Sequence, residues 1–112
     1  MYGIEVRESE AGLLIELRGE FDVFCIEELK STLDDATLYR GPVLVDLSEI
    51  TFLDLRSARE LAVRSMLSPN RPTYVDPSPQ VMATMSALGL EGWTNALPGV
   101  GRGGPWVTSG VS

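Results

Sequence analysis

The chain has 112 residues, of which 44% are hydrophobic and 22% charged, a composition typical of one folded domain and unlike that of a disordered segment. Its formal net charge of −7 disfavours binding to nucleic-acid phosphates or anionic lipid, so we expect neither as a partner. The single cysteine, Cys25, cannot form an internal disulfide, and the chain has no histidine to activate a thiol or complete a zinc site. We therefore expect no metal site, no cofactor and no catalytic residue.

The sequence also carries no signal for export or membrane insertion. Its first residues lack a charged region followed by an apolar one, and no run of 18 apolar residues occurs anywhere in it. A lone cysteine suits a reducing compartment. We expect a cytoplasmic protein.

The first predicted elements form a hairpin. Apolar and polar residues alternate from Tyr2 to Glu8 and from Leu13 to Arg18, as they do in strands with one buried face. Residues 9–12 form a polar, glycine-containing connection of the length that joins hairpin strands. The pattern therefore predicts an antiparallel pair of strands at the N-terminal edge of a sheet.

The following segments alternate between helix and strand. After a loop at 19–22, apolar residues recur at spacings of three and four from Val23 to Tyr39, which indicates an amphipathic helix. The continuous apolar run from Pro42 to Leu47 predicts a central strand that is covered on both faces. Beyond a loop at 48–54, we expect a helix from Leu55 to Leu67, a strand at 73–75, a helix from Val81 to Leu88 and a last short segment at 93–97.

This order of elements predicts an α/β fold with a mixed β-sheet, an antiparallel N-terminal edge and helices packed on the sheet. We expect a single domain over residues 1–97. Residues 98–112 contain five glycines and two prolines, so we expect them to form a flexible C-terminal tail.

Three motifs in this order resemble the STAS domain, the fold of bacterial anti-sigma factor antagonists. Gly19-Glu20-Phe21-Asp22 resembles the family's loop before its first helix, and residues 43–54 resemble its central strand and the loop that follows. Residues 75–81 resemble its turn from strand to helix near the C-terminus. The resemblance covers about residues 2–97. It implies a module that binds an anti-sigma factor or serine kinase-like partner in the regulation of transcription.

The sequence departs from this family at the residue that serves as its switch. In the family the loop after the central strand ordinarily reads Asp-Ser-Ser-Gly, and the cognate kinase phosphorylates the second serine, which blocks binding. Here the loop reads Asp54-Leu55-Arg56-Ser57, so Arg56 stands where that serine would be and Ser57 where the glycine would be. The resemblance therefore implies a constitutive or degenerate antagonist.

The chemistry of this loop leaves several alternatives open. Asp54 can accept hydrogen bonds from the first amides of the predicted helix, but Ser57 and Glu60 have capping-box spacing and offer another helix start. A partner surface that prefers an uncharged serine would bind Arg56 weakly, whereas an acidic surface would bind it strongly. Ser57 is one position away from the usual serine, about 100° around the helix, and it is a candidate phosphorylation site.

The candidate partner-binding residues come from this loop and from the first motif: Asp22, Asp54, Leu55, Arg56, Ser57 and Arg59. The spacing of Arg56, Arg59 and Arg64 predicts a basic docking stripe on the second helix. The alternative is a solvated helix face on which Glu60 offsets part of the positive charge. The alternative for Asp22 and Asp54 is a purely structural role, in which they only stabilise a loop and cap a helix.

The sequence favours a protein-interaction module over an enzyme, because none of its carboxylates is combined with a base, a nucleophile or a metal-binding set. The alternative function is a STAS-type sensor of a small ligand or nucleotide within a signalling assembly.

Overall fold

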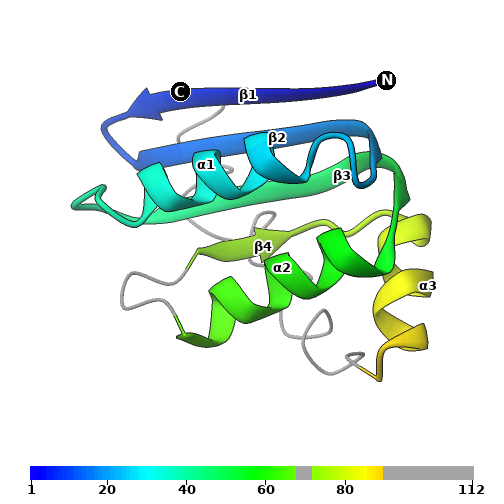
Figure 1. The fold of residues 1–112 in the computed structure, drawn as a ribbon. Coiled ribbons are helices and arrows are strands. Elements are labelled where there is room, and N and C mark those ends of the chain that lie inside the picture. Colours follow the sequence, from blue (N-terminus) through cyan, green and yellow to red (C-terminus); the bar gives the residue numbers. More distant parts are fainter. Residues whose placement is uncertain (68–71, 90–112) are drawn as a thin grey trace.

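The computed structural model describes residues 1–67 and 72–89. The strands in these ranges form one mixed sheet in the order β1-β2-β3-β4. At one edge β1 (Tyr2–Ser9) and β2 (Gly12–Phe21) are antiparallel. β3 (Val43–Leu53) runs parallel to β2, and β4 (Thr73–Val75) runs parallel to β3 (Figure 1). This topology confirms the predicted α/β fold with an antiparallel N-terminal edge.

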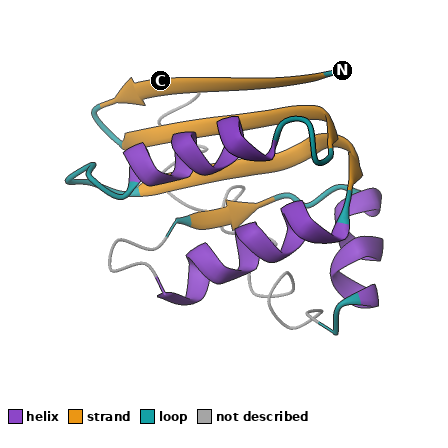
Figure 2. Cartoon of the chain, in the orientation of Figure 1, coloured by secondary structure: helices purple, strands orange, loops and turns teal. Residues whose placement is uncertain are grey.

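The helices of the described ranges are α1 (Ile26–Ala36), α2 (Leu55–Leu67) and α3 (Pro79–Ala87). α1 and α2 lie side by side over one face of the sheet, and α3 lies near the end of β3 (Figures 1 and 2). α3 packs against both β3 and α2. Parallel strands need a crossover connection, and helices in these crossovers pack back onto the sheet.

The core lies between the sheet and the helices. Ile15 of β2 and Val45 of β3 lie opposite each other in the register and are both fully buried. Leu29 and Leu33 of α1 belong to the predicted apolar stripe and are buried in the same cluster. Each such aliphatic side chain stabilises the fold by roughly 1.5–3 kcal/mol when it leaves water. The apolar periods of helix and strand therefore determine which faces meet.

The other face of the hairpin carries a charged ladder. Glu5 and Glu16 lie directly opposite each other in the register, an arrangement in which like charges repel. Arg7 forms an ion pair with Glu16, and Arg18 forms one with Glu5. Hydrogen bonds to these carboxylates raise the pKa of both guanidinium groups. Because the pairs are exposed, their main effect is to cancel the repulsion rather than to add stability.

The predictions of loops at 19–22 and 48–54 are partly wrong. Residues 19–21 continue β2, and residues 48–53 continue β3. The two strands stay paired as far as Phe21 and Leu53, with register shifts along the way. Such irregularities let a ladder continue past residues that break the alternating pattern.

The first helix is shorter than the range predicted from Val23 to Tyr39, because a turn precedes it and α1 spans only Ile26–Ala36. The predicted segment at 93–97, the domain boundary at residue 97 and the tail at 98–112 lie outside the described residues. Within the described ranges, none of the helices is both long enough and apolar enough to cross a membrane.

Candidate functional site

The carboxyl ends of β2 and β3 bring two of the predicted site loops together. Phe21 and Leu53 are register partners at the ends of these parallel strands. The Asp54 amide donates a hydrogen bond to the Phe21 carbonyl at 3.0 Å. The loop that begins with Asp22 therefore lies beside the turn that leads into α2. In open α/β sheets, binding sites commonly form outside such carboxyl ends.

Asp54 caps the first turn of α2. Its carboxylate Oδ1 accepts a hydrogen bond from the Ser57 amide at 2.8 Å, and its carbonyl accepts one from the Ala58 amide at 3.0 Å. In this N-cap geometry a short polar side chain satisfies an amide that has no partner within the helix. Of the two helix starts that the sequence allows, the structure adopts the one at Asp54. Glu60, from the other alternative, pairs with Arg64.

Ser57 lies inside the molecule. Its side chain is 0% exposed, and its hydroxyl has no hydrogen-bond partner among residues 1–67 and 72–89. Burying a hydroxyl without a partner costs about 1–3 kcal/mol. A kinase needs an accessible hydroxyl. Phosphorylation of Ser57 therefore stays a prediction, and it requires the first turn of α2 to open.

Asp22 shapes the turn between β2 and α1. Its Oδ1 accepts a hydrogen bond from the Phe24 amide at 3.0 Å, and its carbonyl accepts one from the Cys25 amide at 3.1 Å. The buried Cys25 thiol donates to the same carbonyl at 3.3 Å. Burial raises the pKa of this thiol, which keeps it protonated at neutral pH. Cys25 therefore packs beneath the turn, and α1 begins immediately after it.

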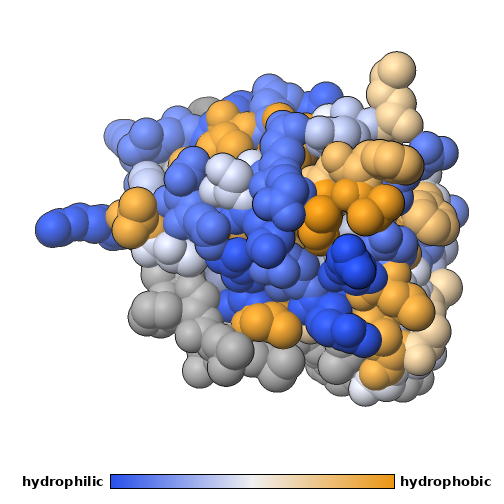
Figure 3. All heavy atoms as spheres, in the orientation of Figure 1, coloured by the Kyte–Doolittle hydropathy of each residue, from blue (hydrophilic) through white to orange (hydrophobic). Residues whose placement is uncertain are grey.

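The same turn holds two apolar side chains out of the core. Phe24 is 89% exposed, and Val23 is also exposed. Phe52 near the end of β3 and Leu55 at the start of α2 are exposed as well. These make up four of the eight large hydrophobic side chains that are exposed among the described residues. Figure 3 shows hydrophobic surface gathered on the side of the molecule where α1 and α2 begin.

Two arginines border these apolar side chains. Arg56 and Arg59 are exposed near the start of α2, and neither forms an ion pair within residues 1–67 and 72–89. Arg64 differs, because it is only 17% exposed and pairs with Glu60 at 2.7 Å and with Asp34 of α1. The predicted basic stripe is thus divided, since Arg64 joins two helices while Arg56 and Arg59 face solvent. We call the exposed residues at this end of the molecule the carboxyl-edge surface: Val23, Phe24, Phe52, Leu55, Arg56 and Arg59.

Sequence reasoning missed Val23, Phe24 and Phe52 as surface residues. The sequence does hold a signal for Phe24, because it falls outside the apolar stripe that begins at Ile26. No local pattern in the sequence marks Phe52 as a surface residue. Its exposure follows from a register shift that pairs Glu20 with Phe52 after Gly19 has paired with Ile50.

The two aspartates at this edge act as turn and cap formers. The carboxylates of Asp22 and Asp54 each hold a backbone amide, at 3.0 and 2.8 Å. In the part of the chain that the structure describes, no three His, Cys, Asp or Glu side chains are grouped closely enough to hold a metal ion. The arrangement offers a partner apolar contact area and two positive charges.

Comparisons with known proteins establish the fold. No protein-family model matches the chain, and no curated protein matches its sequence. Its structure is similar to that of the anti-sigma factor antagonist SpoIIAA in its unphosphorylated form, with a TM-score of 0.66 and 18% identity over 82% of this chain and 85% of the other. It is also similar to an anti-sigma factor antagonist from Mycobacterium paratuberculosis, with a TM-score of 0.69 and 18% identity over 84% of this chain and 83% of the other. The chain therefore has the STAS-like fold of anti-sigma factor antagonists.

Proposed function

We propose that the chain is a protein-interaction module that binds its partner through the carboxyl-edge surface. The observation that carries this proposal is the concentration of exposed apolar side chains at one edge, next to two arginines without ion pairs in the described residues. Contiguous apolar patches rimmed by polar groups mark protein-binding sites. Phe24 suits the role of an anchor, because a large exposed aromatic side chain gains the most from burial in a partner's pocket.

The partner that we propose is an anti-sigma factor or a serine kinase-like protein, and the role is regulation of transcription in the cytoplasm. The support is the fold, which the chain shares with two proteins described as anti-sigma factor antagonists. The motif that ends in Asp22 and the loop at Asp54 lie side by side at the proposed binding edge, which adds further support.

We further propose that binding is constitutive. Arg56 occupies the position at which the resemblance places the phosphorylated serine, and a serine kinase cannot modify it. The neighbouring Ser57 is buried. The surface therefore keeps its positive charge under all conditions, which favours a partner with an acidic surface. Since the whole chain carries a net charge of −7, this attraction is local and should weaken as salt increases.

The test is a calorimetric titration of the full chain with the anti-sigma factors and serine kinase-like proteins of its own organism. Arg56→Glu should weaken binding by at least ~1 kcal/mol, which is about fivefold. Phe24→Ala should weaken binding by about 1–2 kcal/mol. The matched control is Arg40→Glu, which reverses an exposed arginine in the loop after α1. Equal losses in both arginine variants would show that only net charge matters, and no binding to any candidate would contradict the module.

A second experiment tests the missing switch. Arg56→Ser places a serine at the position where the resemblance expects phosphorylation. Incubated with ATP and a kinase-like partner that binds the wild type, this variant should gain one phosphate and lose affinity, whereas the wild-type chain should gain none. Phosphorylation of the wild-type chain at Ser57, detected by fragment masses, would contradict constitutive binding.

A further inference from the structure

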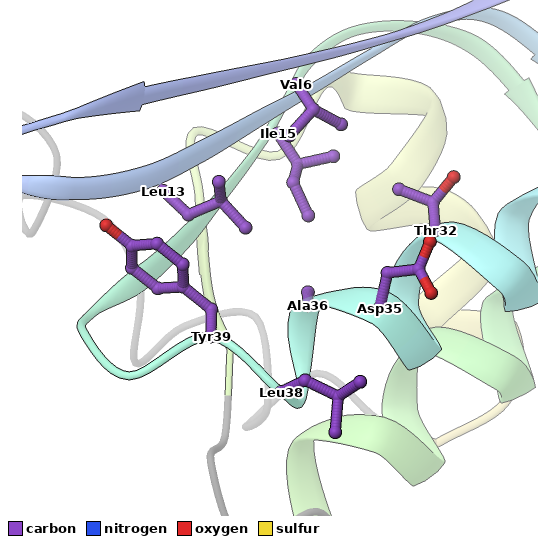
Figure 4. Close-up of a pocket in the computed structure, with 8 residues that line it drawn as sticks. All are labelled: Val6, Leu13, Ile15, Thr32, Asp35, Ala36, Leu38 and Tyr39. Carbon is purple, nitrogen blue, oxygen red and sulfur yellow. The ribbon is translucent and has the colours of Figure 1, made fainter.

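A cavity lies at the opposite end of α1 from the carboxyl-edge surface. It has a volume of about 500 Å³ and opens to solvent between the β1–β2 hairpin and the last turn of α1 (Figure 4). This volume falls within the range of small-molecule sites. The residues around it come from both strands, from α1 and from the loop that follows: Val6, Leu13, Ile15, Thr32, Asp35, Ala36, Leu38 and Tyr39.

The walls of this cavity are mainly apolar. Ile15 and Ala36 are buried and form its inner side, where they belong to the hydrophobic core. Leu38 is 80% exposed and Val6 is 49% exposed, although both line the cavity. Apolar side chains held open to water at a concave site are stabilised when an apolar ligand covers them. The cavity is therefore suited to the apolar part of a ligand.

The polar groups of the cavity select a positive charge. The exposed Asp35 carboxylate forms no ion pair in the described ranges, whereas its neighbour Asp34 pairs with Arg64. The Thr32 hydroxyl donates to the Glu28 carbonyl at 2.9 Å, so its oxygen can only accept a hydrogen bond from a ligand. In the view of Figure 4, Asp35 and Thr32 lie together on one side of the cavity, and the Tyr39 hydroxyl points away from them. None of the lining residues is basic.

We infer that this cavity binds a small organic cation, an ammonium or guanidinium group carried on an apolar chain or ring. The apolar part lies against Ile15, Ala36 and Leu38, and the cation lies beside Asp35, where Thr32 accepts one of its hydrogen bonds. An anionic ligand of the same shape would meet the Asp35 carboxylate without any compensating base. This site is separate from the proposed partner surface and does not depend on it.

The test uses hexylammonium, hexanol and hexanoate, which share an apolar chain and differ in charge. Each is titrated into the ¹⁵N-labelled full chain at low salt, and amide shifts are followed by NMR. Hexylammonium should cause saturable shifts around Leu13, Ile15 and Ala36, and it should bind more tightly than hexanol. Hexanoate should bind most weakly. Shifts confined to other residues, or equal affinity for hexylammonium and hexanoate, would overturn the inference.

Two variants and a control test whether Asp35 supplies the negative charge that binds hexylammonium. Asp35→Asn should lower the affinity for hexylammonium roughly twofold to fivefold, the range expected for an exposed ion pair, and should leave hexanol binding unchanged. Leu38→Ser should weaken both ligands without unfolding the protein, because Leu38 is exposed. Glu27→Gln removes the same charge from the other end of α1 and should change neither affinity. If Glu27→Gln lowers the affinity for hexylammonium as much as Asp35→Asn does, the effect is one of net charge and the site is refuted.

Discussion

The carboxylate of Asp54 accepts a hydrogen bond from the amide of Ser57 at 2.8 Å, while the buried hydroxyl of Ser57 has no hydrogen-bond partner in the part of the chain that the structure describes. Asp54 therefore caps α2, and the Ser57 side chain does not. The hydroxyl is left in a place where it destabilises the fold. The candidate phosphorylation site is thus buried in the first turn of α2, and its neighbour Arg56 faces solvent.

Removal of the Asp54 carboxylate should destabilise the protein. Asp54→Ala leaves the Ser57 amide without its partner, and we expect the free energy of unfolding to fall by about 1 kcal/mol. Asp54→Asn keeps an oxygen that can accept the same hydrogen bond, so it should lose only a few tenths of that amount. Urea denaturation followed by circular dichroism measures both. Equal losses in the two variants would show that the charge matters and the cap does not.

Removal of the Ser57 hydroxyl should stabilise the protein. Ser57→Ala eliminates a buried hydroxyl that has no partner among the described residues, and we expect the free energy of unfolding to rise by about 1 kcal/mol. Part of any gain comes from the higher helix propensity of alanine. Ser31→Ala, at an exposed position within α1, measures that part alone. A gain at Ser57 no larger than the gain at Ser31 would mean that the hydroxyl has a partner in solution.

Tyr74 should make the stability depend on alkaline pH. Its buried hydroxyl donates a hydrogen bond to the Leu61 carbonyl at 2.8 Å, and burial raises its pKa well above the ordinary value of 10.0. The unfolded chain therefore loses this proton first, so the stabilisation is complete below about pH 10 and is lost as the pH rises further. Tyr74→Phe should cost about 1 kcal/mol near neutral pH. Plots of the free energy of unfolding against pH for the wild type and for Tyr74→Phe should converge near pH 11. Parallel plots would contradict this expectation.

Cys25 should react slowly with alkylating reagents in the folded protein. Its thiol is fully buried, and burial raises its pKa. Since the thiolate is the reactive form, we expect alkylation by iodoacetamide near pH 8 to be at least about tenfold slower than in urea. Mass spectrometry over time measures both rates. Similar rates would mean that the turn at Asp22 opens readily and that the Cys25 thiol becomes exposed.

The elements with strong local patterns were predicted well. The helix expected from Leu55 to Leu67 and the strand expected at 73–75 have the same bounds in the structure. The hairpin is also confirmed, with β1 at the edge and antiparallel to β2. These segments are bounded by proline-rich connections or short turns, and their apolar periods agree with the faces that are buried in the sheet and helices.

The candidate site was predicted less completely. The position of Asp54 before an apolar helix predicts a cap, and the structure shows the hydrogen bond from the Ser57 amide to the Asp54 carboxylate. The buried state of Ser57 and the ion pairs of Arg64 depend on neighbouring elements, and Asp34 is 30 positions away from Arg64 in the sequence. A helical wheel shows which residues share a face, but it does not show what packs against that face.

The sequence by itself determined the order of strands and helices and the antiparallel N-terminal edge. These features follow from the residue types and from apolar periods over a few turns. Only the tertiary structure decided that β2 and β3 extend to Phe21 and Leu53, that Phe24 stands out in solvent and that a cavity opens beside Asp35. The reason is physical, since each of these features depends on strand register and packing between segments that are distant in the chain.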